Sequence, residues 1–336
     1  MLPLIFIYSY KMGRARRETA SGEGNPMVSI CLPNLNNRAF LPERITSIRD
    51  QSFKDYEVVI SDNFSDDGAF EYFQEYERSD SRVRLFQKPR NGMYANWNNC
   101  LEAARGEWIY FATSDDSMSA DCLQKLVNLG NQVPDCGLVT SASWIIGLAG
   151  DDQSQDWNDR LGRLLAGRRV TAGRLDGRRE LLAGMLFGTP TVSMTQMIIR
   201  RSLFERTGLL PLEYGSSGDF IWQMRAFRLA TSAYLPRKVG SWRRHESQAT
   251  SSNVQGLIDQ RARMLMAMWR GNELARGADM EVALGFALAW SQEPLPDGLP
   301  LRTRRAARLM KGRQRTKPAV FMAVVVTRIV ALLSNA

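Results

Sequence analysis

Residues 28–36, VSICLPNLN, and residues 57–68, EVVISDNFSDDG, decide the fold of this chain of 336 residues. Each stretch begins with a short apolar run rich in β-branched residues and turns polar where the run ends, as a buried strand does when it leaves a sheet. The same pattern recurs at residues 83–86 and 108–112. Helix-like segments lie between these runs, at residues 40–51, 69–78 and 96–104. This alternation predicts an α/β fold with a mainly parallel central sheet flanked by helices.

The predicted strands are followed by polar loops, two of which are acidic. In an open parallel sheet, ligands bind at the carboxyl ends of the strands. We therefore expect the functional site where these loops meet. The residues that we single out there are Pro33, Asn34, Asn36, Asp62, Asp115 and Asp116.

The adjacent acids Asp115 and Asp116 suit a divalent metal ion. Mg²⁺ and Mn²⁺ prefer oxygen ligands, often one or two carboxylates completed by water and substrate phosphates. The same residues also suit a structural role, because Ser114 or Asp116 could cap a helix that begins near Ala120. Both interpretations stay open when the pair is considered alone.

Several common α/β enzyme motifs are absent from the sequence. There is no Gly-x-Gly-x-x-Gly after the first strand, which disfavours a dinucleotide-binding fold, and no Gly-x-x-x-x-Gly-Lys-Ser/Thr, which disfavours a phosphate-loop NTPase. The lack of a Gly-x-Ser-x-Gly elbow weakens a serine hydrolase.

The net charge of +9 is concentrated at the ends of the chain. Residues 302–317 hold eight basic residues and no acid, whereas the body of the chain is close to neutral. A nucleic-acid-binding domain would carry its positive charge on the fold itself, so no nucleic-acid partner is expected.

The order and spacing of the predicted strands and of the polar loops that follow them resemble those of glycosyltransferase family 2. The resemblance runs from the first strand to Ser114-Asp115-Asp116 and resumes at residues 197–208, 218–222 and 242–245. It implies a GT-A fold and a metal-dependent, inverting glycosyltransferase that takes its sugar from a nucleotide-diphosphate donor. Ser114 stands where many relatives carry another aspartate, so the acidic motif is slightly reduced.

The resemblance also implies roles for individual residues. Asp62 would bind the base of the donor, in a pocket that Pro33, Asn34 and Asn36 line, and Asp115 would lie near the ribose. Asp116 would hold Mn²⁺ or Mg²⁺ on the diphosphate, with His245 near the metal or diphosphate and Arg244 beside it. Asp219 would be the catalytic base.

Each of these roles has a structural alternative. Asp62 could cap a turn, and Asp219 could cap the helical run that follows it. His245 is the sole histidine of the chain and could be structural, although the cluster Arg243-Arg244-His245 suits a diphosphate.

The sequence predicts three regions. Residues 1–26 form a tail or linker, and translation from Met27 fits the pattern as well as translation from Met1. Residues 27–250 form the GT-A catalytic domain, and residues 251–336 form a helical extension with a basic and apolar tail. A basic segment beside an apolar one suits an anionic membrane surface, so residues 302–336 are expected to make peripheral contact with the inner face of the membrane from the cytoplasm.

The function that follows is sugar transfer to an acceptor hydroxyl of a glycan or lipid-linked glycan, in bacterial surface polysaccharide or glycolipid assembly. Two alternatives remain. A nucleotidyltransferase also uses an acidic pair and a metal, but would carry a Gly-rich basic loop after the first strand. A non-catalytic nucleotide-sugar-binding protein on the same fold would bind the donor without transfer.

Overall fold

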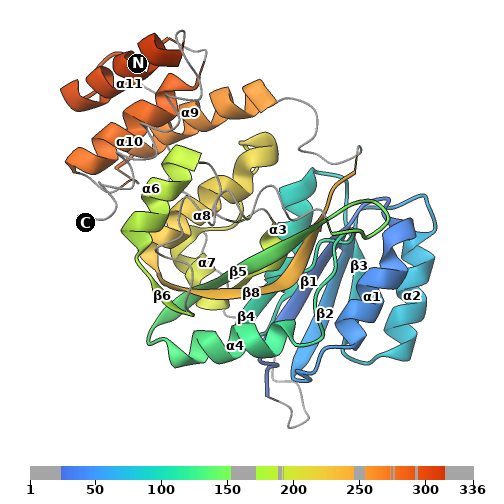
Figure 1. The fold of residues 1–336 in the computed structure, drawn as a ribbon. Coiled ribbons are helices and arrows are strands. Elements are labelled where there is room, and N and C mark those ends of the chain that lie inside the picture. Colours follow the sequence, from blue (N-terminus) through green and yellow to red (C-terminus); the bar gives the residue numbers. More distant parts are fainter. Residues whose placement is uncertain are drawn as a thin grey trace.

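The computed structural model describes residues 24–152, 172–187, 191, 193–245, 254–272, 274, 277–291 and 294–314. Its centre is one sheet of eight strands in the order β3-β2-β1-β4-β7-β5-β8-β6 (Figure 1). The strands are β1 (Val28–Asn34), β2 (Tyr56–Asp62), β3 (Val83–Gln87), β4 (Trp108–Phe111), β5 (Cys136–Ile146), β6 (Gly173–Leu175), β7 (Met197–Arg200) and β8 (Thr231–Arg243).

The first half of the sheet is parallel, as predicted. β1 lies between β2 and β4, and its pairing with β2 runs from Val28 opposite Tyr56 to Asn34 opposite Asp62. Every residue of β1, β2 and β4 is buried, which explains their unbroken apolar runs. Pro33 does not end the first strand, because the pairing with β4 stops at Cys31 and the missing N–H costs no bond on that side.

The second half of the sheet is mixed. β7 pairs antiparallel with both β4 and β5, β5 pairs parallel with β8, and β6 closes the edge antiparallel to β8. Four of the seven pairings are therefore parallel and three antiparallel. Antiparallel β7 brings η2 (Met194–Gln196), the short helix before it, to the side of the sheet where β4 ends.

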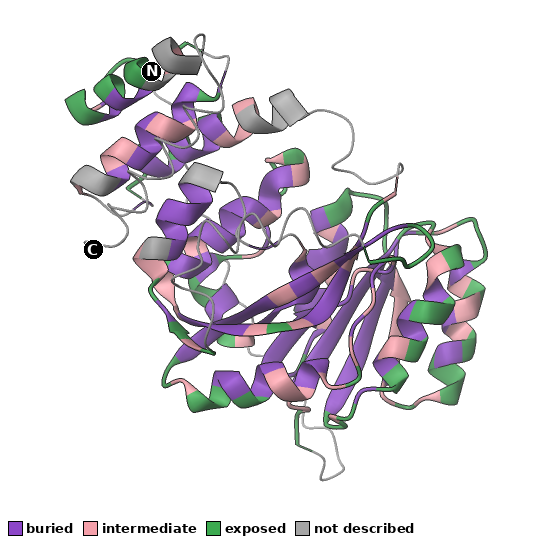
Figure 2. Ribbon diagram, viewed as in Figure 1, coloured by how far each residue is buried: buried purple, intermediate pink, exposed green. Residues whose placement is uncertain are grey.

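Helices cover both faces of the sheet, and the central strands are coloured as buried along most of their length (Figure 2). The buried hydrophobic side chains form two clusters, one on each face. One cluster joins the sheet to α1 (Leu41–Arg49), α2 (Ala69–Ser79) and α4 (Cys122–Gln132). The other joins it to α3 (Met93–Ala103), α6 (Gly177–Phe187), α7 (Arg201–Thr207) and α8 (Gly218–Leu229). These observations confirm the predicted α/β class with a helix-flanked central sheet.

A helical extension follows the sheet and packs on the α6 and α8 side (Figure 1). It consists of α9 (Val254–Arg270), α10 (Ala278–Ala289) and α11 (Leu301–Gln314), and α9 and α10 share the apolar cluster of α8. The chain turns between α9 and α10, where Asn272 and Gly277 have positive φ angles. None of the helices within the described ranges has the length and apolar character needed to cross a membrane.

The predicted tail up to residue 23 and the chain after residue 314 lie outside the described residues. The domain boundary near residue 250 stays a prediction.

A buried carboxylate ties the parallel strands together at the edge opposite the predicted site. Glu57 of β2 accepts hydrogen bonds from Ser29 Oγ of β1 at 2.6 Å and from the Arg105 N–H at 2.8 Å. The guanidinium groups of Arg84 and Arg105 donate to its other oxygen at 3.1 and 3.0 Å. Burial acts to raise the pKa of Glu57, but these hydrogen bonds and charges outweigh it and lower that pKa below its ordinary value of 4.5.

We expect Glu57→Gln to lower the free energy of unfolding by about 2 kcal/mol at neutral pH, because two guanidinium groups lose their carboxylate. A carboxyl group with a lowered folded-state pKa stabilises the fold above its ordinary pKa, and this stabilisation is lost as the pH falls through the folded-state value. The difference between native protein and variant should therefore shrink towards about pH 3. Urea unfolding at both pH values measures it.

The exposed variant Glu102→Gln is the matched control and should change little. An equal loss in both variants, or a loss that does not depend on pH, would contradict this role of Glu57.

Candidate active site

A cavity of about 640 Å³ opens where β1, β2 and β4 end. Its walls come from the loops after these strands, the start of α3, η2, the start of α8 and the end of β8. The sequence-predicted residues that line it are Pro33, Asn34, Asn36, Asp115, Asp116, Asp219 and His245. Segments far apart in the sequence thus meet at the edge of the sheet where the site was expected.

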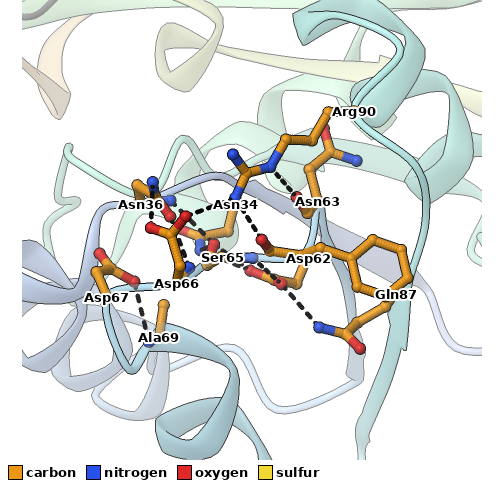
Figure 3. A network of polar contacts seen from close by, with 11 residues as sticks. Asn34, Asn36, Asp62, Asn63, Ser65, Asp66, Asp67, Ala69, Gln87 and Arg90 are labelled. Carbon is orange, nitrogen blue, oxygen red and sulfur yellow. Dashed lines mark hydrogen bonds and ion pairs between the residues drawn. The ribbon is translucent and has the colours of Figure 1, made fainter.

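Asp62 lies behind this wall rather than in it. It is fully buried at the end of β2, directly opposite Asn34 in the register of the sheet. Its carboxylate accepts hydrogen bonds from Asn34 Nδ2 at 2.9 Å and from the Ser65 hydroxyl and N–H at 2.6 and 2.9 Å, and Gln87 lies at 3.3 Å (Figure 3). In this conformation Asp62 orients Asn34, which does line the cavity, and its predicted contact with the donor base stays a prediction.

The loop after β2 also fixes Arg90 at the rim. Arg90 Nε donates to the Asn63 carbonyl at 2.9 Å, and its Nη2 lies 3.1 Å from an Asp66 oxygen (Figure 3). The other oxygen of Asp66 accepts from Asn36 Nδ2 at 2.9 Å. Arg90 lines the cavity, and its place shortly after the third strand is the sequence signal that could have indicated it.

Asp116 is a buried carboxylate at the end of the loop after β4. Its Oδ1 accepts from the Arg243 N–H at 2.7 Å, and its Oδ2 accepts from Thr113 Oγ1 at 2.5 Å and from Ser193 Oγ at 3.1 Å. Burial, and then the charge of Asp115, raise the pKa of Asp116 to about 7. The side chain therefore joins three segments, the β4 loop, η2 and the end of β8.

Asp115 turns the other way and meets His245. Its Oδ2 lies 3.0 Å from His245 Nε2, and within the described part of the chain its Oδ1 has no hydrogen-bond partner. The imidazole also lies against the ring of Phe40, with centroids 5.4 Å apart. His245 is thus held on two sides while it lines the cavity.

The two arginines before His245 have opposite environments. Arg243 is buried with a 2% exposed side chain, and its guanidinium donates to the carbonyls of Asp115, Gly147 and Leu148 and to Glu43 Oε2. Arg244 is exposed and does not line the cavity. The structure therefore places Arg243, not the predicted Arg244, against the acidic loop, and the donor-binding role of Arg244 stays a prediction.

Asp219 lies in the first turn of α8, and Ser217 rather than Asp219 is the N-cap residue. One oxygen of Asp219 accepts from the Tyr94 hydroxyl at 2.9 Å and from the Phe220 N–H at 2.7 Å. Burial raises the pKa of Asp219, and the hydrogen bond from Tyr94 is the first of the interactions that oppose this increase. A carboxyl group with a raised pKa at a cavity wall is suited to accept a proton.

The acidic wall fits a divalent ion as a partial site. Asp115, Asp116 and His245 offer carboxylate oxygens and an imidazole nitrogen, which Mn²⁺ or Mg²⁺ accepts. Asp116 accepts hydrogen bonds from two hydroxyls and a backbone N–H, which are neutral donors. An adjacent cation would therefore be needed to offset the negative charge of its carboxylate. Over the described ranges, no three His, Cys, Asp or Glu side chains are arranged to hold an ion by themselves. Water and ligand phosphates would have to complete the coordination.

Comparison with known proteins shows the family to which the chain belongs. Residues 29–208, more than half of the chain, match the family model for glycosyl transferase family 2. One relative is the GalNAc(5)-diNAcBac-PP-undecaprenol beta-1,3-glucosyltransferase of Campylobacter jejuni, 33% identical over 109 residues, or 32% of this chain and 35% of that enzyme. The match thus spans about a third of the relative's length.

Two solved structures share the fold. S. aureus TarS 1–349 in complex with UDP-GlcNAc has a TM-score of 0.61 at 19% identity, over 78% of this chain and 72% of that chain. The mannosyltransferase PcManGT from Pyrobaculum calidifontis, in complex with GDP-Man and Mn²⁺, has a TM-score of 0.56 at 16% identity, over 92% of this chain and 81% of that chain. These likenesses confirm the predicted GT-A fold.

The difference in burial between Arg243 and Arg244 predicts different effects of the two residues on stability. We expect Arg243→Met to lower the free energy of unfolding by about 3 kcal/mol, because three buried carbonyls and Glu43 lose their donor. Arg244→Met should change it by less than about 0.5 kcal/mol, as is usual for an exposed side chain. Urea unfolding compares the two, and equal effects would contradict the assignment.

Proposed function

The chain belongs to glycosyltransferase family 2, and from this premise we propose that it moves a sugar from a nucleotide-diphosphate donor to an acceptor hydroxyl, with inversion at the sugar carbon. The proposal depends on one observation: Asp115, Asp116, His245 and Asp219 line the same cavity. Sugar transfer needs stabilisation of the departing diphosphate, alignment of the acceptor and a base for its proton. The cavity offers a group for each.

The donor would lie over the loops after β1, β2 and β4. Asn34 and Asn36 line this part of the cavity, and Asp62 supports it from behind through its bond to Asn34. Arg90 at the rim and His245 at the opposite acidic wall are basic groups within reach of a bound diphosphate. TarS was solved with UDP-GlcNAc and PcManGT with GDP-Man, which supports a nucleotide sugar as the donor.

Asp115, Asp116 and His245 would hold the divalent cation. When bound, Mn²⁺ or Mg²⁺ neutralises charge on the diphosphate and so makes it a better leaving group. The presence of Mn²⁺ in PcManGT supports this assignment. The residues of the chain keep the acids in place, since Thr113, Ser193 and the backbone of Arg243 fix both oxygens of Asp116.

Asp219 would take the proton from the acceptor hydroxyl. The carboxylate is held by Tyr94 and by the Phe220 N–H, and it lines the same cavity as the acidic pair. A positioned base of this kind contributes roughly 10²–10⁴-fold to a rate. The attack of the hydroxyl oxygen forms the new glycosidic bond as the bond to the diphosphate breaks, from opposite faces of the sugar carbon.

The acceptor is proposed to be a glycan, or a glycan on a lipid, in bacterial surface polysaccharide or glycolipid assembly. The name of the Campylobacter relative describes a glycan on undecaprenol diphosphate, which supports a lipid-linked acceptor. Such an acceptor would bring the enzyme to the cytoplasmic face of a membrane.

Helix α11 supports peripheral contact with an anionic membrane. Thr303 and Ala307 are buried against the rest of the protein, whereas Arg304, Arg305 and Arg308 are exposed. Leu309 is also exposed beside these arginines. A cationic helix face with exposed apolar side chains is attracted to anionic headgroups by roughly 1 kcal/mol per basic residue.

Ligand-dependent thermal shift tests the donor and metal assignments. We expect UDP, GDP, UDP-GlcNAc or GDP-mannose with Mn²⁺ to raise the melting temperature, because a ligand at 100 times its Kd stabilises the native state by about 2.7 kcal/mol. Asp116→Asn should abolish the part of the shift that needs Mn²⁺. Asp135→Asn is the control, since this exposed aspartate has φ 55°, a conformation that asparagine also tolerates.

Release of nucleoside diphosphate from the donor that binds then separates the candidate functions. Asp219→Asn should keep the shift and lose catalysis. Normal binding without turnover in the native protein would favour the non-catalytic alternative, and no shift with any nucleotide sugar and metal would overturn the proposal.

Vesicle sedimentation tests the membrane contact. Native protein should bind phosphatidylglycerol vesicles, and the triple variant Arg304→Gln, Arg305→Gln, Arg308→Gln should bind at least about tenfold more weakly, since three charges are removed. Phosphatidylcholine vesicles and high salt serve as controls. Equal binding of native protein and variant would contradict a role for α11.

A further inference from the structure

Helix α9 packs against the short segment that carries Asp219. Gln260 Nε2 donates to the Tyr214 carbonyl at 2.6 Å, and the Ser217 hydroxyl donates to Gln260 Oε1 at 3.3 Å. Tyr214 precedes η3 (Gly215–Ser217) and Ser217 is its last residue, and η3 leads directly into α8. One side chain of α9 thus joins the two ends of the turn before Asp219 and fixes the direction in which α8 begins.

The next residue of α9 brings a positive charge to the same place. Arg261 lies over the ring of Phe220 with its guanidinium carbon 5.2 Å from the ring centre. Its side chain is half-buried, and among the described residues its buried Nε has no hydrogen-bond partner. Asp219 and Tyr94 are the groups that interact electrostatically with this guanidinium. Phe220 directly follows Asp219, so this contact brings the positive charge close to the start of α8, and a nearby cation favours an ionised carboxylate.

Tyr94 of α3 supports Asp219 from the other side. Its hydroxyl lies 2.9 Å from an Asp219 oxygen and 3.1 Å from the Ser216 carbonyl, so a single proton serves one acceptor at a time. The ring is buried against the start of α8, where a Cβ on Gly218 would lie only 2.7 Å from it. The ring therefore packs closely against the α8 backbone next to Asp219.

A proposed base must be ionised, and these contacts favour the ionised form of the buried Asp219. Burial favours the neutral carboxyl group, which cannot accept a proton, and it raises the pKa of Asp219. The hydrogen bond from Tyr94 and the charge of Arg261 both act against this increase. Within the described part of the chain, the side chains that act on Asp219 in this way come from two elements, Tyr94 on α3 and Arg261 on α9.

We propose that Tyr94 and Arg261 are positioning residues for Asp219: Tyr94 orients the carboxylate through its hydrogen bond, and the charge of Arg261, held over Phe220, helps to keep it ionised, so that α9 of the helical extension is part of the catalytic apparatus. The proposal rests on the proposed role of Asp219 as the base. Both Asp219 and Arg261 lie after residue 208, where the match to the family model ends. The extension thus has a use beyond covering the apolar face of α8.

Carboxyl NMR tests this directly. In protein labelled with ¹³C at the aspartate Cγ, the resonance of Asp219 is the one missing from Asp219→Asn, and its titration needs no substrate. We expect Arg261→Met to raise the titration midpoint by about 1 pH unit, the lower end of the effect of an adjacent opposite charge. Arg261→Lys keeps the charge and should restore the midpoint towards the native value. Tyr94→Phe should raise it as well.

Arg270→Met is the matched control, because Arg270 is exposed in the last turn of the same helix and should leave the midpoint unchanged. Circular dichroism checks that each variant is folded, and Tyr94→Phe with Arg261→Lys carries the test if Arg261→Met does not fold. With a donor identified by thermal shift, the acid limb of kcat against pH should move by the same amount as the midpoint.

An Asp219 midpoint that is unchanged in Arg261→Met and in Tyr94→Phe would overturn the proposal and leave Arg261 with a packing role on Phe220. Indistinguishable effects of Arg261→Met and Arg261→Lys would overturn the role of charge. If the midpoint shifts as expected while Asp219→Asn retains full activity, the positioning contacts are supported and the assignment of Asp219 as the base fails. The two proposals therefore fail in different ways.

Discussion

The site depends on one buried guanidinium. Arg243 at the end of β8 reaches across to the loop after β4, where its side chain holds the Asp115 carbonyl and its own N–H holds Asp116. A charge with a 2% exposed side chain is tolerated because carbonyls and Glu43 satisfy it. The parallel and the mixed halves of the sheet are thereby locked together at the edge where the acids point into the cavity.

This arrangement explains why Asp115 and Asp116 have different environments. Asp116 is turned inward and fixed through both oxygens, whereas Asp115 is turned towards His245 with one oxygen unbonded among the described residues. Both residues lie in the turn after β4, which ends at Phe111, and this one backbone segment supports both environments. Under the proposed function the pair would hold an ion only together with further ligands, and metal binding would then be coupled to the binding of a diphosphate.

Much of the first half of the fold could be predicted from the sequence. The runs around Val28, Val58 and Trp108 are buried on both faces, and this burial produces the continuous apolar pattern that indicates a parallel strand. β7 and β6 are only four and three residues long, too short to show a period, so the mixed half of the sheet was not predicted. The split between α9 and α10 depends on the positive φ angles at Asn272 and Gly277, which local sequence does not dictate.

The sequence indicated many of the residues that form the site but not how they are arranged in space. The loops after the strands indicated Asn34, Asp115 and Asp116, because the topology brings strand ends to one edge. The sequence could not separate Arg243 from Arg244, since their difference in burial arises from contacts with β4 and β5 loops far away in the chain. For the same reason the contacts of Tyr94 and Arg261 with Asp219 become visible only once α3, α8 and α9 are packed together.

The central claim is that a carboxylate wall and a diphosphate share one cation. Electron paramagnetic resonance of free Mn²⁺ measures the affinity of the protein for the ion in the absence and in the presence of UDP or GDP. Linkage requires each ligand to strengthen the binding of the other if both occupy this site. The account predicts weak Mn²⁺ binding that becomes at least about tenfold tighter with one of the two nucleotides, a coupling of about 1.4 kcal/mol. Mn²⁺ binding that neither nucleotide changes would contradict it.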